Sequence, residues 1–186
     1  MLSDNFMWFP QESGSQIVGE THDQYFNKKG AFEVSKFGFD IKGEEATEEA
    51  GPGNSGKAKF GTFTVDKFVD TASVPLYKAC CRATIFPSIM LAVRKSGGSS
   101  LLFMQYIFRY NQIVGVKWDG GSGDERPKET LTIIFKAMGV QYIPQNADGT
   151  EGTRQNWSWN TSDQGSASLI IDGIEAPPKF LSGSGK

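Results

Sequence analysis

The sequence is poor in histidine and cysteine, and this shortage excludes several classes of chemistry. Its 186 residues include one His and two Cys. A structural zinc site needs about four Cys or His ligands at short spacings, which His22, Cys80 and Cys81 do not supply. Ser–His–Asp or Cys–His catalysis would depend on His22, which lies in the polar stretch ETHDQ and is interpreted as an exposed loop residue. We therefore predict a protein that is not an enzyme and that needs no metal and no cofactor.

The chain also lacks an excess of charge of one sign and a long apolar run. It has 19 Lys and Arg against 21 Asp and Glu, a net charge of −2. A nucleic-acid partner would require a basic patch, so none is expected. No apolar run approaches the roughly 20 residues of a membrane span, so no membrane insertion is expected. The beginning of the chain has neither the basic region nor the cleavage site of a secretory signal.

The two cysteines, Cys80 and Cys81, are adjacent in the sequence. Neighbouring cysteines bond to each other only with strain. We interpret them as one or two buried, reduced thiols, which is typical of a cytoplasmic protein.

What the sequence does contain is aromatic and β-branched residues in alternating runs. The two longest are residues 103–118 and 130–144, joined by the Gly- and Pro-containing stretch 119–129. Alternation with period two in residues that favour strands predicts two long, bent antiparallel strands. The alternation slips after Phe135, so we predict a β-bulge near Lys136–Ala137 that returns the apolar side chains to the core.

The rest of the chain predicts further strands and one helix. Strands are expected at Asn5–Gln11, Ala31–Ile41, Ala58–Phe68, Thr84–Arg94, Ser99–Tyr110 and over NWSWN at residues 156–160. The helix is expected at Thr71–Ala83, with Ser73 as N-cap and Leu76, Ala79, Cys80 and Ala83 on one face. The predicted fold class is mainly β, a curved antiparallel β-barrel with one flanking α-helix.

A chain of this length is expected to form one domain. We place it at residues 1–165, followed by an extension at residues 166–186 that we expect to be partly flexible. The extension holds one apolar run, Ser168–Ile174, which would otherwise add an edge strand or dock on an oligomeric ring.

The segment Gly43–Lys57 is acidic. Its glutamates, Glu44, Glu45, Glu48 and Glu49, would form like-charge pairs in a helix, which is unfavourable. Glycines and Pro52 then break regular structure. A loop of this length is usually either functional or disordered.

Several separate runs occur in an order that resembles a known family. They are VDKFVDTASVPLYKACC from residue 65, LAVRKSGG from residue 91, GGSGDERPKETLTIIFKAMGVQYIPQNADGT from residue 120, and NWSWN. In this order they resemble the haemolysin-coregulated protein (Hcp) of bacterial type VI secretion, over about residues 3–162.

The resemblance implies a barrel related to phage tail tubes that assembles into hexameric rings. The rings stack into the inner tube of an injection apparatus, so the expected partners are further copies of the chain and the sheath, spike and baseplate proteins. Small effectors would be carried in the ring lumen. The tube would leave the bacterial cytoplasm for the extracellular space or a target cell without a signal peptide.

The resemblance also implies which residues of the chain contact cargo and which contact the neighbouring rings. Alternation in Ala31–Ile41 points Phe37 and Phe39 to the core and Lys36, Gly38 and Asp40 the other way. The resemblance places this second face on the lumen, in contact with cargo. The family usually has a small polar residue where this chain has Gly38, which leaves hydrogen bonding to cargo open. In a second interpretation Gly38 permits curvature of the sheet.

The acidic loop corresponds to a family loop that reaches the next ring. That loop is usually glycine-rich with little charge, whereas the predicted contact residues here are Glu44, Glu45, Glu48, Glu49, Asn54 and Lys57. We predict that they meet a basic patch of the stacked ring, unless the loop is disordered and orders only in the tube.

A function of another class remains open, a ligand- or carbohydrate-binding β-barrel with Trp157 and Trp159 as a sugar platform. Exposure of these tryptophans distinguishes the two, because a tube subunit is expected to pack both against the barrel.

Overall fold

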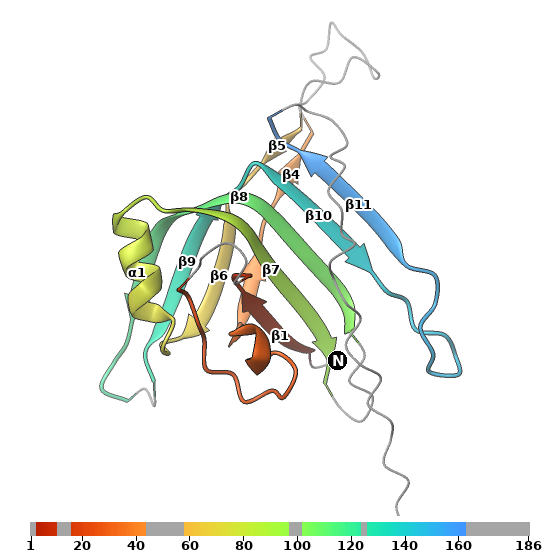
Figure 1. The fold of residues 1–186 in the computed structure, drawn as a ribbon, viewed down its shortest axis with the longest axis horizontal. Helices are drawn as coiled ribbons and strands as arrows, with labels where there is room; N and C mark the ends of the chain where they lie inside the picture. Colours follow the sequence, from red (N-terminus) through yellow and green to blue (C-terminus); the bar gives the residue numbers. More distant parts are fainter. Residues whose placement is uncertain (1–2, 11–15, 44–57, 97–101, 124–125, 163–186) are drawn as a thin grey trace, which may run out of the picture.

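The computed structural model describes residues 3–10, 16–43, 58–96, 102–123 and 126–162. It contains a curved antiparallel sheet in the order β2-β1-β7-β8-β9-β6-β3, with β10 paired to β8 and β11 to β10, and a small β4-β5 sheet (Figure 1). The strands are β1 Ser3–Trp8, β2 Phe32–Glu33, β3 Lys36–Gly38, β4 Ile41–Lys42, β5 Lys59–Phe60, β6 Phe63–Phe68, β7 Ile85–Lys95, β8 Leu102–Asp119, β9 Lys128–Ile134, β10 Ala137–Tyr142 and β11 Gln155–Asn160; the helices are α1 Ser73–Cys81 and a 3₁₀ turn, Asn27–Lys29. The mainly β fold with one flanking α-helix is confirmed.

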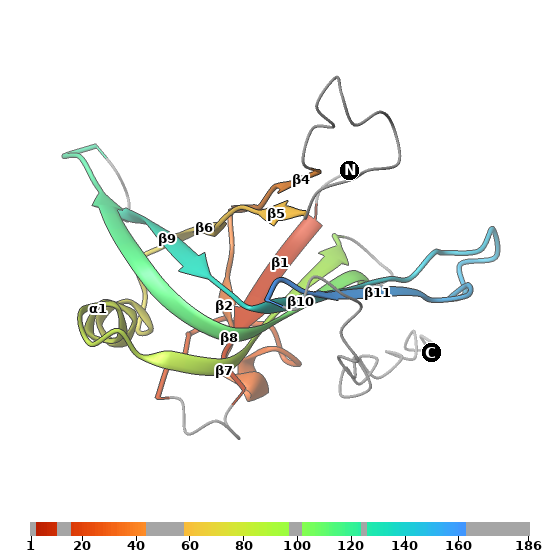
Figure 2. The same cartoon turned by 90° about the horizontal axis from the view of Figure 1, so that it is seen from above.

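The sheet curves strongly but its strand ladder does not close into a cylinder (Figure 2). Its two edge strands, β2 and β3, follow one another in the chain. The N–H of Val34 donates to the carbonyl of Asn5 on β1, and the N–H of Ser35 to the carbonyl of Asp66 on β6. The predicted single strand Ala31–Ile41 was therefore wrong, because this segment changes partner from one edge of the sheet to the other.

The core lies on the concave side of the sheet and follows the predicted alternation. Phe63 and Val65 on β6 and Leu131 and Ile133 on β9 are fully buried. Phe63 stacks on Phe108 of β8 with ring centroids 4.2 Å apart. Close packing of this kind fixes which face of each strand points inward.

The helix α1 covers one side of the barrel with Leu76 and Ala79 buried. It ends earlier than predicted, since Ala83 lies beyond it with φ +50° and is exposed. Cys80 is half-buried and Cys81 exposed, and both are free thiols, so the prediction that at least one of them is buried was wrong. In the described part of the chain, no helix is long and apolar enough to cross a membrane.

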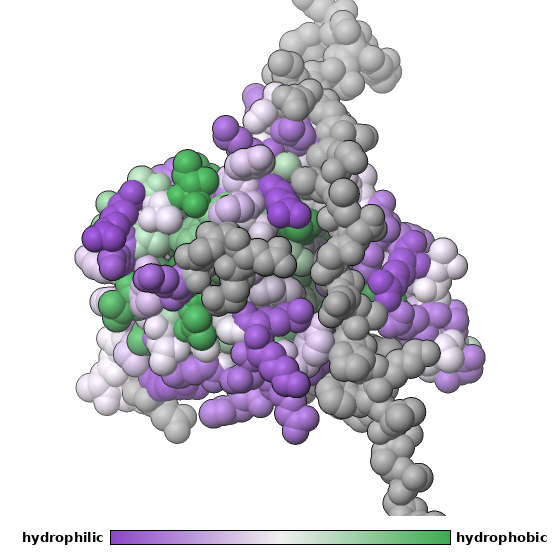
Figure 3. Space-filling model, viewed as in Figure 1, coloured by the Kyte–Doolittle hydropathy of each residue, from purple (hydrophilic) through white to green (hydrophobic). Residues whose placement is uncertain are grey.

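The outer side of α1 is apolar. Val74 is 70% exposed, and Tyr77 stacks on Trp118 of β8 with ring centroids 5.4 Å apart. Figure 3 shows hydrophobic side chains among hydrophilic ones on this side of the molecule, while mostly hydrophilic ones lie at the opposite edge of the view, near β10 and β11.

The predicted β-bulge near Lys136–Ala137 was wrong. β9 and β10 are separate strands that pair with β8 in one continuous register, Gln112 with Ile134 and Arg109 with Ala137. Equal numbers of residues separate these pairs on both strands, so none is inserted there. The extra residue lies on β8 at Val114, where the register against β9 shifts by one.

A second, smaller apolar cluster lies on the convex side of β1 and β7. Phe26, from the segment before the 3₁₀ turn, stacks on Phe6 with ring centroids 4.2 Å apart. The Arg94 guanidinium lies 4.9 Å from the centre of the Phe6 ring and forms ion pairs with Asp23 and Asp4. Burial opposes ionisation of Asp23, but hydrogen bonds from Arg94 and from the backbone N–H groups of Phe26 and Tyr25 hold its pKa below the usual value.

Candidate functional site

Small and polar side chains cover the convex side of β3, β6, β9 and the second half of β8. The register aligns them in two rows, Lys36–Asp66–Thr130–Lys117 and Gly38–Thr64–Thr132–Gly115, which we call the threonine face. The Thr130 hydroxyl donates to the Asp66 carboxylate at 2.7 Å, and the Thr64 hydroxyl donates to the carbonyl of Gly38 at 3.2 Å. The result is a polar surface on which the hydroxyl groups of Thr130 and Thr64 already donate hydrogen bonds within the chain.

The predicted lumen residues fall on or beside this face. Lys36 is exposed and Gly38 half-buried, both on β3. Asp40 lies beyond the end of β3, exposed, with an ion pair of 3.4 Å to Lys42. Their aromatic neighbours point to the core as predicted, since Phe37 and Phe39 both pack against the buried cluster.

Gly38 is not required by the fold. A Cβ added there would meet one atom within 4 Å, the Thr64 hydroxyl oxygen at 3.8 Å, which is ordinary contact. Its φ is not positive either. Neither packing nor backbone strain explains this glycine, so the structure gives no support to the interpretation that it is needed for curvature.

The predicted stacking residues Glu44, Glu45, Glu48, Glu49, Asn54 and Lys57 lie outside the described residues. The strands on either side of them, β4 and β5, lie together at one end of the barrel (Figure 1).

Two basic side chains lie at the opposite end of the barrel, with acidic ones such as Asp119 and Asp70 near them. At the last residue of β6, Phe68 pairs with Lys128, the first residue of β9. The Phe68 ring has the Arg126 guanidinium 5.3 Å and the Lys128 ammonium 5.7 Å from its centre. We call Phe68, Arg126 and Lys128 the basic end; β6 separates it from β4 and β5 by about 20 Å at the rise of an extended strand.

The strands β10 and β11 project beyond the barrel as an arm (Figure 2). Trp157 and Trp159 stack with centroids 6.2 Å apart, opposite Val140 and Met138 and therefore on the same side as the core. Trp157 is 42% exposed, so the prediction that both tryptophans pack against the barrel was wrong for Trp157. The reason is tertiary: in the described part of the chain β11 pairs with β10 alone, at an edge of the sheet.

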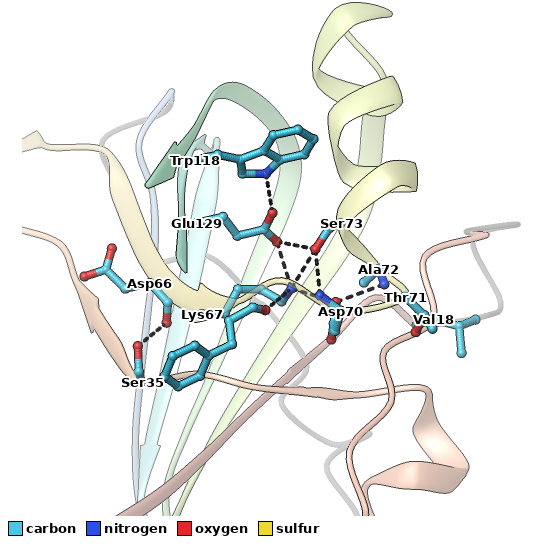
Figure 4. A network of polar contacts seen from close by, with 11 residues as sticks. Val18, Ser35, Asp66, Lys67, Asp70, Thr71, Ala72, Ser73, Trp118 and Glu129 are labelled. Atoms are coloured by element: carbon cyan, nitrogen blue, oxygen red, sulfur yellow. Dashed lines mark hydrogen bonds and ion pairs between the residues drawn. The ribbon is translucent and has the colours of Figure 1, made fainter. Parts of the chain in front are cut away.

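A buried polar network that the sequence analysis missed joins α1 to the sheet (Figure 4). Lys67 on β6 is 1% exposed. Its ammonium donates to the Glu129 carboxylate at 2.7 Å and to the Asp70 carboxylate at 2.6 Å. Lys67 follows Phe63 and Val65 at core spacing, which was the available signal for its burial.

Glu129 accepts two further hydrogen bonds, from the Ser73 hydroxyl at 2.9 Å and from the Trp118 indole at 2.6 Å. Ser73 is therefore not the N-cap that was predicted. It is the first residue of α1, and Asp70 accepts the N–H of Ala72 instead. The network fixes the start of the helix on the sheet. Among the described residues no group of His, Cys, Asp and Glu is arranged to hold a metal ion.

Comparison with known proteins gives one consistent answer. The family model described as "Type VI secretion system effector, Hcp" matches residues 6–142. Protein hcp1 of Pseudomonas aeruginosa PAO1 is 33% identical over 96 residues, which are 50% of this chain and 59% of that protein's length.

The fold agrees with solved structures over almost all of the described chain. A type six secretion system protein has a TM-score of 0.79 at 26% identity, covering 89% of this chain and all of its own. Hcp1 from Salmonella typhimurium has a TM-score of 0.70 at 23% identity, covering 90% of this chain and all of its own. With a family match from β1 to the end of β10 and the same curved sheet, this protein belongs to the Hcp family of type VI secretion.

Proposed function

We propose that this protein is the structural subunit of a type VI secretion inner tube. Six copies form a ring, and the rings stack into a tube that is exported with small effectors in its lumen. The strongest support is the agreement of the fold with a type six secretion system protein over 89% of the chain. The chain acts as framework and not as an enzyme. It is made in the bacterial cytoplasm, leaves through the type VI apparatus, and meets sheath, spike and baseplate proteins during assembly.

A contact between neighbours in the ring is assigned to the arm. A ring requires a head-to-tail interface in which one surface meets a different surface of the next copy. The core-side face of the arm presents Trp157 and Tyr142, 42% and 41% exposed, next to half-buried Trp159. Burying an aromatic side chain contributes about 1.5–3 kcal/mol, so a neighbouring subunit that covers this face gains stability from it.

Stacking between rings is assigned to the two ends of the barrel. The acidic loop at residues 44–57 follows β4 at one end, and the basic end lies at the other. Rings stacked head to tail bring these opposite charges together. Exposed ion pairs contribute roughly 0.2–1 kcal/mol each, and ions screen them beyond about 8 Å at physiological strength, so stacking should weaken as salt rises.

The threonine face is proposed to line the lumen and meet cargo, with Lys36, Gly38 and Asp40 among its contacts. Small polar side chains with few free donors favour weak, reversible contact with many protein surfaces. Such contact suits a carrier that must release its cargo.

The first test is the solution mass, by light scattering after size exclusion, with negative-stain imaging. We expect a species near six times 20.4 kDa and a ring. Trp157→Ser should shift the protein towards smaller species, while Ile85→Ser, at an apolar position on β7 that is 66% exposed, should not. A wild-type chain that stays monomeric at high concentration would argue against ring formation. Dissociation by Ile85→Ser alone would place the interface elsewhere.

Light scattering across a salt series tests the stacking contact on the same material. Rings that remain while stacks shorten with rising salt are the expected result. Stacks that are insensitive to salt would contradict the assignment to the acidic loop and the basic end.

The stacking of exposed Trp157 on half-buried Trp159 is the specific observation that favours the alternative, a carbohydrate-binding barrel. This alternative predicts saturable quenching of tryptophan fluorescence by a sugar, carried by a monomer. The tube assignment predicts no such quenching and instead a fluorescence change on ring assembly.

A further inference from the structure

The convex side of the arm carries a row of amide side chains that is incomplete within the described chain. The register places Gln105 of β8 next to Gln141 of β10, and Gln141 next to Asn156 of β11. Ile107 and Gly139 form the next row. We call these five residues the glutamine face; they point away from Trp157 and the core.

Two of these amides are buried without the hydrogen bonds that burial requires. Gln105 is 1% exposed, and neither its Nε2 nor its Oε1 has a partner. Gln141 is 5% exposed; its Nε2 donates to the Asn156 side chain at 3.0 Å, but its Oε1 has no partner. A glutamine amide has two donors and an acceptor oxygen, and such groups are almost always bonded when buried. A polar group that supplies both donors and acceptors belongs over this row.

The described chain covers only the neighbouring part of this side. Residues 16–31 cross β1 and β7, where Phe26 packs on Phe6 and Trp8. In Figures 1 and 2 this ribbon does not extend over β10 and β11. The apolar members of the adjoining surface, Leu102 and Ile107, are 3% and 5% exposed and lie at the border of the buried cluster that holds Phe26.

An extended backbone with apolar side chains fits this surface. Its N–H and C=O groups alternate and can pair with both atoms of an amide side chain. Its side chains can pack on Leu102 and Ile107. A segment paired with the outer edge of β11 would leave Gln105 without a partner, which favours docking on the face over addition of an edge strand.

We propose that residues 168–174 of the same chain, SLIIDGI, lie across the glutamine face. Their backbone hydrogen-bonds to the amides of Gln105 and Gln141, and their Leu and Ile side chains pack on Ile107. The run is the one apolar stretch in residues 163–186. It begins eight residues after Asn160, the last residue of β11, which lies opposite Ala137.

The connection is long enough to reach. From Ala137 to Gln141 is four residues along β10, or about 13 Å. The seven residues from Thr161 to Ala167 span up to about 23 Å when extended. Docking therefore needs no second copy of the chain, and it does not depend on the proposed ring.

Hydrogen exchange read by mass spectrometry tests this on the full chain, at a concentration where it is a single subunit and again in the assembled state. We expect the amides of residues 168–174 to exchange at least tenfold more slowly than a free chain in both states. Exchange at the free-chain rate in both states would overturn the proposal. Protection found only in the assembled state would also overturn it, because the segment would then dock on a neighbouring copy.

The variant Gln105→Leu distinguishes a docked segment at residues 168–174 from a Gln105 side chain that is buried without any partner. If nothing docks, replacing an unpartnered buried amide by an apolar side chain raises Tm and changes no exchange elsewhere. If the segment docks, its backbone loses hydrogen bonds, so protection of residues 168–174 falls at least threefold. Gln112→Leu, at a half-buried glutamine on the same strand, is the matched control and should leave that protection unchanged.

A second variant changes the segment instead of the sheet. Leu169→Asp with Ile171→Asp should abolish the protection, while Ser182→Asp should not. Protection that survives the double substitution would show that the apolar side chains do not hold the segment, and would overturn the proposal even if Gln105→Leu fails to fold.

Discussion

Removing the buried ammonium of Lys67 should destabilise the subunit strongly. Lys67→Met keeps an unbranched apolar side chain but leaves the Glu129 carboxylate, whose side chain is 0% exposed, without its cation. Deleting one partner of a buried ion pair costs about 3–5 kcal/mol. Glu129 keeps the hydrogen bonds from Ser73 and Trp118, so we expect a loss near the lower limit, about 3 kcal/mol.

The assay is urea unfolding followed by far-ultraviolet circular dichroism, at one fixed subunit concentration because assembly raises apparent stability. In thermal unfolding of a chain of this size, the same loss of free energy lowers Tm by about 6–12 °C. Lys117→Met is the control. Lys117 is 77% exposed and 3.9 Å from Asp119, and such a pair contributes about 0–1 kcal/mol.

The double variant Lys67→Met/Glu129→Gln tests the cause. It removes the more deeply buried of the two charges that Lys67 pairs with, while an amide oxygen remains to accept the hydrogen bond from Ser73 or Trp118. We therefore expect it to be more stable than Lys67→Met alone. The reasoning is refuted if Lys67→Met costs no more than Lys117→Met, or if the double variant is less stable than the single one.

Three further predictions concern acid, the lumen position and the core. Hydrogen bonds and Arg94 lower the pKa of Asp23 in the folded chain, so its carboxylate stabilises the fold above pH 3.8, and this stabilisation is lost as pH falls through the folded pKa. Asp23→Asn should therefore reduce the change of the unfolding free energy with pH in that window, and an unchanged pH dependence would contradict this. Gly38→Ser should change the unfolding free energy by less than about 0.5 kcal/mol, since the nearest atom to an added Cβ is 3.8 Å away, and a larger loss in urea unfolding would show a steric role for the glycine. Phe108→Ala should cost about 3–5 kcal/mol, because Phe108 is fully buried and stacked; a loss below 1 kcal/mol would mean that the core refills the cavity.

The strand-rich fold class was predictable because alternation is a local property. The spacing of Phe63 and Val65, like that of Leu131 and Ile133, is enough to predict a buried face. Local spacing does not say which edge a strand pairs with. The break of Ala31–Ile41 into β2, β3 and β4 follows from a change of partner, from β1 to β6.

The candidate site was predictable only in part. Lys36 and Gly38 share a face because β3 has period two, but Thr64, Thr132 and Gly115 join them through the register of three other strands. Asp40 lies two residues beyond the end of β3, so the strand register does not fix its place beside them. The exposure of Trp157 depends on β11 projecting beyond the barrel, which no pattern in NWSWN encodes.

The sequence by itself determined the family, the mainly β class, the single helix and the inward side of most strands, because motif order and side-chain period are properties of the chain. Only the tertiary structure decided how the sheet curves, where β8 is bulged, and which distant polar groups meet. Lys67 and Glu129 are 62 residues apart and form one buried pair. Such pairing depends on register across strands, which a one-dimensional pattern does not contain.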